Sequence, residues 1–113
     1  MADPLPLLKG TLDVLVLKAL SWTPMHGFEI TQWLEGRSAG ALGVQDSALY
    51  QALHRLEARG LVAAEWGVTA NNQRARYYRV TDDGQAHLAA ETAQWVRYAR
   101  TVTSILTAAP SPT

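Results

Sequence analysis

The clearest hydrophobic pattern in the chain lies in residues 46–61, DSALYQALHRLEARGL. At roughly 100° per residue, four apolar side chains fall on one stripe of a helix, namely Leu49, Ala52, Leu53 and Leu56. The opposite side carries Ser47, Gln51, His54 and Ala58, with Tyr50 and Arg55 flanking it. We expect Asp46 or Ser47 to cap the helix, and Gly60 to end it in a left-handed conformation. The pattern predicts a helix that packs on one side and offers hydrogen-bonding groups on the other.

Two short strands are predicted after this helix, over residues 61–66 and 76–80. The polar segment GVTANNQRA between them predicts a loop. Tyr77 and Tyr78 should point to opposite faces of the second strand, so that one is in the core and the other is partly exposed. A helix followed by a strand, a polar loop and a strand is the second half of a winged helix. In that fold the helix enters the DNA major groove, and the loop reaches the neighbouring backbone or minor groove.

Two further helices are predicted before this unit. Residues 11–20 have apolar residues at helical spacing, and the turn at residues 21–25 contains Pro24. Residues 26–35 form the second predicted helix, which starts at His26. Its apolar members are Phe28, Ile30, Trp33 and Leu34. We interpret Trp33 and Trp66 as packing residues.

A long helix is predicted to start after Thr81, which can cap it, with two aspartates in the first turn, where the helix dipole favours them. A heptad-like seam then runs along it through Leu88, Thr92, Trp95, Ala99, Val102 and Leu106. A second copy of the chain is the simplest cover for this seam. We therefore predict a mainly α fold with a two-stranded β-wing, a DNA-binding domain over residues 1–81, and a dimerisation helix with a disordered tail over residues 82–113.

The composition limits the class of protein. The 113 residues contain no cysteine and no apolar run near the roughly 20 residues of a membrane span, and the amino-terminal segment lacks a basic region before an apolar run. We therefore expect a cytoplasmic protein. The net charge is zero, but residues 37–81 carry six arginines against three acidic residues, a local excess of +3. Such a local excess is enough to attract a polyanion.

Several segments together resemble the PadR family of bacterial transcriptional regulators. They are GTLDVLVLKAL, MHGFEI, ALYQALHRLEARGLV, the pair Glu65-Trp66, RARYYRVTDDG and Trp95. The resemblance implies a winged helix-turn-helix and a dimerisation helix in a homodimeric repressor, often released from DNA by a small ligand such as a phenolic acid or a drug. In some members of the small subfamily with a single dimerisation helix, paired tryptophans stack flat aromatic ligands, and Trp95 is the matching position. Gln51 departs from the family, which commonly has proline there, and this alters the exposed edge of the helix.

The candidate DNA contacts are polar residues of the third helix and the loop, namely Ser47, Tyr50, Gln51, His54, Arg55, Asn72, Arg74 and Arg76. Glutamine suits adenine, and arginine suits guanine or phosphate. The same residues could instead be an ordinary solvated surface. Trp95 is the candidate for ligand stacking, although plain dimer packing would also explain it. None of the three histidines has a cysteine or another histidine three or four residues away, so we expect no metal site. We also expect no cofactor and no catalytic site, since the sequence has no nucleophile elbow, no phosphate loop and no paired carboxylates on a defined face.

Two other functions compete with a DNA-binding regulator. The chain could be a winged helix that binds another protein and no longer binds DNA, as its neutral total charge and Gln51 would allow. It could also be a small-molecule-binding protein in which Trp95 is the active feature. Salt-dependent DNA binding would contradict the first alternative, and tryptophan quenching without DNA affinity would support the second.

Overall fold

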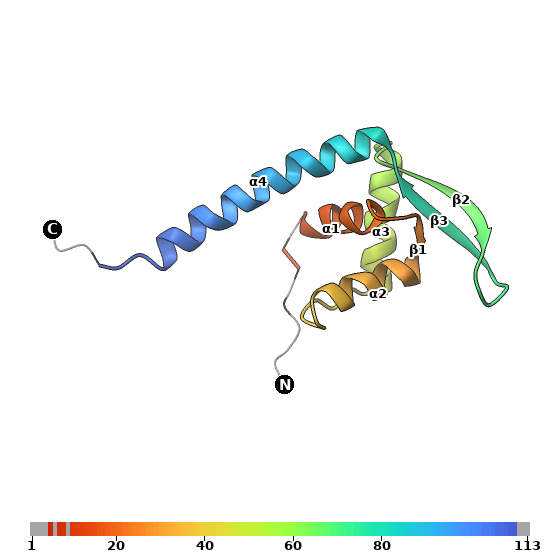
Figure 1. Ribbon diagram of the computed structural model, residues 1–113, viewed down its shortest axis with the longest axis horizontal. Helices are drawn as coiled ribbons and strands as arrows, with labels where there is room; N and C mark the ends of the chain where they lie inside the picture. The colour runs from red at the N-terminus through yellow and green to blue at the C-terminus, as the bar shows by residue number, and fades with distance from the viewer. Residues whose placement is uncertain (1–4, 6, 9, 111–113) are drawn as a thin grey trace.

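The computed structural model describes residues 5, 7–8 and 10–110. Its elements follow the order α1 (Thr11–Leu20), β1 (Met25–His26), α2 (Gly27–Arg37), α3 (Asp46–Ala58), β2 (Val62–Val68), β3 (Arg74–Val80) and α4 (Asp82–Leu106). Helices α1–α3 pack beside the small sheet, and α4 runs away from them, so the molecule measures 66 × 37 × 21 Å (Figure 1). The predicted mainly α fold with a β-wing is confirmed. Most of residues 1–9 and all of residues 111–113, predicted to be tails, lie outside the described residues.

The hydrophobic core is centred on α1 and α3. Val16 and Leu17 of α1 and Leu56 of α3 are fully buried, and Ile30 of α2 joins them. The predicted stripe on α3 is confirmed, because Leu49, Ala52, Leu53 and Leu56 are all buried. Burial of these side chains fixes the orientation of α3 and leaves its polar side facing outward.

The ends of α3 differ in how well the sequence predicted them. Gly60 has a φ of 72°, the left-handed conformation expected after the helix. The predicted cap was wrong, because Gln45 occupies the capping position and makes no side-chain hydrogen bond. Asp46 is already a helical residue in the first turn, where its charge faces the positive end of the helix dipole, and Ser47 follows it.

The sheet has three antiparallel strands in the order β1-β3-β2, not the two that were predicted. Strand β1 pairs Met25 with Tyr78 and His26 with Tyr77. Two residues are too few to show an alternating pattern, so this strand could not be predicted from the sequence. Tyr78 is buried and Tyr77 is only half-buried, which confirms the prediction that they point to opposite faces.

Helix α4 is anchored to the body through its first two turns. The Thr81 hydroxyl accepts a hydrogen bond from the Gly84 N–H at 3.0 Å, which confirms the predicted cap, and donates one to the Gly60 carbonyl at 2.7 Å. Leu88 is buried against the core, whereas the later residues of α4 are exposed or half-buried. Within the described part of the chain, α4 and the other helices are too short or too polar to cross a membrane.

Candidate nucleic-acid interface

The outward side of α3 presents Ser47, Gln51 and His54, all of them exposed. Each lies opposite the buried stripe, so packing within the chain does not use these side chains. Together they offer hydrogen-bond donors and acceptors along the helix face that the sequence predicted. This part of the predicted site is geometrically able to meet the edges of bases in a groove.

Arg55 lies on the same helix but is held by α1. Its guanidinium donates hydrogen bonds to both carboxylate oxygens of Asp13, at 2.6 and 3.3 Å. The hydrogen bond with this carboxylate raises the pKa of Arg55 above its ordinary value. The side chain remains about half exposed, at 52%, so one edge of the guanidinium is still open to solvent. Arg55 therefore joins α1 to α3 while lying at the border of the polar face.

A second ion pair joins α3 to the wing, which we define as β2, β3 and the turn between them. The Arg76 guanidinium lies 2.8 Å from the Glu57 carboxylate. Glu57 is near the end of α3 and Arg76 is in the middle of β3, so the pair links the end of the helix to the wing. Two of the predicted DNA-binding arginines are thus already engaged by acidic side chains.

The wing carries an arginine stacked on a tryptophan. The Arg74 guanidinium carbon lies 4.3 Å from the centre of the Trp66 ring. Trp66 was predicted to be a packing residue, and this was wrong because 60% of its surface is exposed. It lies on the sheet face shared with buried Val62, but so far along the wing that the core no longer covers it. At the turn, Asn72 has a φ of 60°, a conformation that asparagine tolerates better than most residues.

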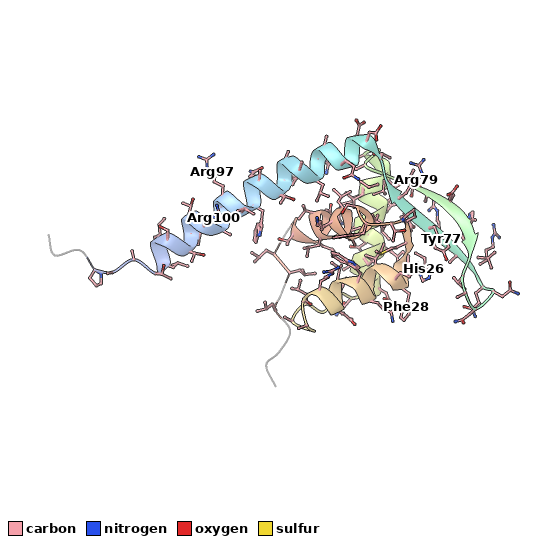
Figure 2. All side chains as sticks on the ribbon, in the orientation of Figure 1. His26, Phe28, Tyr77, Arg79, Arg97 and Arg100 are labelled. Atoms are coloured by element: carbon pink, nitrogen blue, oxygen red, sulfur yellow. The ribbon has the colours of Figure 1, made fainter. Side chains whose placement is uncertain are left out.

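A groove of about 570 Å³ runs between the start of α2 and the wing. Its lining includes Tyr50 from α3, Phe28 from α2, and Trp66, Arg74 and Arg76 from the wing. Phe28 was predicted as an apolar member of its helix, but it points away from the core and is 66% exposed. Figure 2 shows Phe28 beside His26 where α2 begins, and the His26 ring in turn meets the Tyr77 ring of β3 edge-on.

The remaining basic residues of the arginine-rich segment are spread over several surfaces. Arg37 lies over the rings of Trp33 and Trp22 at the end of α2, with 5.2 and 5.6 Å to the two ring centres. Arg79 lies on the sheet face opposite to the groove, as the strand alternation requires (Figure 2). The local excess of positive charge is therefore less concentrated than the sequence suggested. Among the described residues, no cluster of three potential metal ligands is present.

The predicted seam on α4 divides into a buried start and an open continuation. Leu88 packs inside its own chain, whereas Trp95 and Leu106 are 42% and 78% exposed. Between α1 and α4 lies a cavity of about 590 Å³, lined by Val14, Leu15, Leu88 and Trp95 among others. Thr92 borders the same cavity, and Ala99 and Val102 are half-buried further along the helix.

A family model described as the transcriptional regulator PadR-like family matches residues 16–90. This stretch is more than half of the chain and includes most of the core, α3, the wing and the start of α4. The chain belongs to the PadR-like family. Members of this family regulate transcription and are not enzymes. The PadR match also agrees with the winged-helix arrangement of α3 and the wing.

Solved structures agree with this assignment. A PadR family transcriptional regulator from Eggerthella lenta is 32% identical, with a TM-score of 0.76 over 89% of this chain and 86% of that one. A PadR-like transcription factor from Bacteroides fragilis is 29% identical, with a TM-score of 0.70 over 86% and 91% of the two chains. Among curated relatives, protein X from Lysinibacillus sphaericus is 27% identical over 89 residues, which cover 79% of this PadR-like chain and 82% of the relative.

Sequence reasoning missed four side chains at this interface. Phe28 and Trp66 were assigned to the core because their apolar character was the only available signal. Asp13 and Glu57 were not predicted to pair with these arginines, because each lies far in sequence from its arginine partner. Only the packing of α1, α3 and the wing shows which arginines meet acidic partners.

Proposed function

We propose that the protein is a homodimeric repressor that binds a palindromic operator in the cytoplasm. Each subunit would place α3 in a major groove and the wing at the adjacent minor groove. The observation that carries this proposal is the exposed polar side of α3, held by a fully buried stripe and flanked by the wing. PadR transcriptional regulators bind DNA, which supports the same role for this chain.

The proposed dimer rests on the open part of α4. Trp95, Ile105 and Leu106 are large apolar side chains that the chain itself leaves exposed, and 70% of the surface of Ile105 is accessible. The seam repeats at heptad-like intervals, which suits pairing with a second helix. Such a dimer would set the separation of two α3 helices near one turn of DNA, or a multiple of it.

Release by a small flat aromatic ligand is the proposed regulation. The cavity between α1 and α4 is of a size that holds small molecules, and Trp95 forms part of its wall. A ligand there would act by favouring a dimer geometry in which the α3 helices no longer match the operator. The proposal requires the ligand to bind one geometry more tightly than the other.

The test is binding of the purified chain to a labelled fragment from upstream of its own gene, compared with an unrelated fragment across a salt series. We expect selective binding that weakens steeply as salt rises, because phosphate contacts release counterions. An absence of binding at low salt would contradict the DNA-binding role and favour a protein-interaction module. Tryptophan emission, compared between the wild type and Trp95→Phe during titration with flat aromatic compounds, then tests the ligand separately.

A further inference from the structure

We infer that the groove between α2 and the wing holds the sugar–phosphate backbone of one DNA strand, with Phe28 and Trp66 packed against deoxyribose rings. This inference rests on the proposed function and assigns a partner to a surface outside the polar face of α3. It also gives a role to two large exposed aromatic side chains that the core does not explain. Large apolar side chains gathered in a rimmed depression mark a binding surface.

The position of the groove determines which part of DNA reaches it. With α3 in the major groove and the wing at the next minor groove, one strand of the duplex separates the two. That strand has to pass between the two protein elements. The groove lies at this place, because Tyr50 of α3 forms one side of it and Trp66 and Arg74 of the wing form another.

The lining of the groove suits a partner that alternates charged and apolar groups. Arg74 and the Tyr50 hydroxyl can donate hydrogen bonds to phosphate oxygens, whereas Arg76 is held by Glu57 and contributes its positive charge. The rings of Phe28 and Trp66 are 66% and 60% exposed, and they offer flat apolar surfaces to the sugars between phosphates. None of the described residues that line the groove is acidic, so its charge is complementary to a phosphate chain.

Several groove residues are already positioned by the fold. Arg74 is stacked on Trp66, an arrangement that cation–π attraction stabilises and that limits the rotamers of the arginine. Tyr50 lies across the first turn of α2, where a Cβ on Gly27 would come within 2.8 Å of the tyrosine hydroxyl. Glycine at this position is therefore what permits the close approach. Because these side chains are held before DNA arrives, less conformational entropy is lost on binding.

Contacts to the DNA backbone carry no sequence information, whereas contacts from the polar face of α3 to bases do. Loss of a groove contact should therefore weaken binding to every DNA sequence equally.

The experiment uses the full chain and two labelled duplexes, one selected by the wild-type protein from a random library and one of unrelated mixed sequence. Affinity is measured by fluorescence anisotropy across a salt series for the wild type, Trp66→Leu, Trp66→Phe and Arg74→Gln. Trp22→Leu is the matched control, since Trp22 is 61% exposed and also lies near two cations, Lys18 and Arg37.

We expect Trp66→Leu to weaken binding to both duplexes about tenfold, corresponding to about 1.4 kcal/mol, without changing the salt slope. Trp66→Phe should keep most of the affinity, and Trp22→Leu all of it. Arg74→Gln should weaken binding to both duplexes and reduce the slope by about 0.9, the effect of one lost phosphate contact.

Three results would overturn the assignment. Trp66→Leu could match Trp22→Leu, could lose affinity only for the selected duplex, or could lower the salt slope as much as Arg74→Gln does. The first would mean no contact, the second a base contact, and the third an effect only through Arg74. Failure of the wild type to bind either duplex at low salt would instead refute the proposed function, and the groove assignment with it.

Discussion

Asp13 on α1 holds Arg55 on α3 by two hydrogen bonds, the shorter of 2.6 Å, although 42 residues separate them in the sequence. The pair links α3, whose outward side is the polar face, to α1 in the core. Because the pKa of Arg55 is raised, its contribution to stability is fully present below the ordinary arginine pKa and is lost only as the pH rises through the raised value. Substitution is therefore the practical way to break the pair.

Asp13→Asn and Arg55→Gln should destabilise the protein by similar small amounts. An exposed pair of this kind contributes about 0.2–1 kcal/mol, which a double-mutant cycle in urea can measure. Arg55→Gln should weaken DNA binding more than Asp13→Asn, since only the first removes a cation from the interface. Equal DNA affinities for the two variants would show that Arg55 acts only by positioning α3.

Glu57→Gln should strengthen DNA binding. The substitution removes a carboxylate from beside the wing and releases Arg76, which can then form one more phosphate contact and raise the salt slope by about 0.9. Glu65→Gln is the matched control, because Glu65 is exposed on the opposite face of the same wing. Equal gains in affinity for both variants, measured by anisotropy, would mean that only the total charge matters.

The two sides of α3 should respond differently to substitution by alanine. Leu53 is 1% exposed, so Leu53→Ala should lower the free energy of unfolding by about 2–5 kcal/mol. Gln51→Ala, on the exposed side, should change it by less than about 0.5 kcal/mol. The same variant should lose about 1–3 kcal/mol of discrimination at one base pair of a selected duplex. An equal loss of affinity for all DNA sequences would instead mean that Gln51 contacts the DNA backbone.

Gly84→Ala should destabilise the protein by about 1–3 kcal/mol, even though alanine favours helices. A Cβ there would lie 2.0 Å from the Leu61 carbonyl oxygen and 2.6 Å from Val80 Cγ2, so α4 would have to move off the sheet. Gly36→Ala is the control within α2, where a Cβ meets no atom within 4 Å among the described residues. That change should stabilise by about 0.4–1 kcal/mol, and thermal unfolding of both variants checks the contrast.

Val102→Glu should separate the proposed dimer. A carboxylate on the seam would be buried against a second apolar helix, which is costly without a partner. Thr101→Glu places the same group one residue away, off the seam, and should leave the mass measured by light scattering unchanged. If both variants remained dimeric, pairing would have to involve a surface other than this seam.

The success of sequence reasoning depended on the range of the interactions involved. The buried stripe of α3, the Thr81 cap and the left-handed Gly60 follow from residues a few positions apart, and all were predicted. Strand β1 was missed, because its two residues become a strand only by pairing with Tyr77 and Tyr78.

Exposure was harder to predict than secondary structure. Trp66 has the same apolar character as a core residue, and only the length of the wing leaves it uncovered. The two arginines engaged by Asp13 and Glu57 are a similar case, since each pairing depends on how separate helices and strands pack. The local pattern therefore predicted which polar residues lie on the outward side of α3, but it could not predict which of them are free to contact DNA.

Helix α4 is attached to the body through Gly84 and Leu88, and its later residues contribute nothing to the buried core. Substitutions after Leu88 should therefore have little effect on the folding of the part of the chain that contains α3 and the wing. If α4 forms the proposed dimer, two descendants of a gene duplication could diverge in this distal segment and stop forming mixed pairs, while both kept the same α3 and wing. In that dimer, the choice of partner and the choice of target would lie in separate parts of the chain, so each could evolve without disturbing the other.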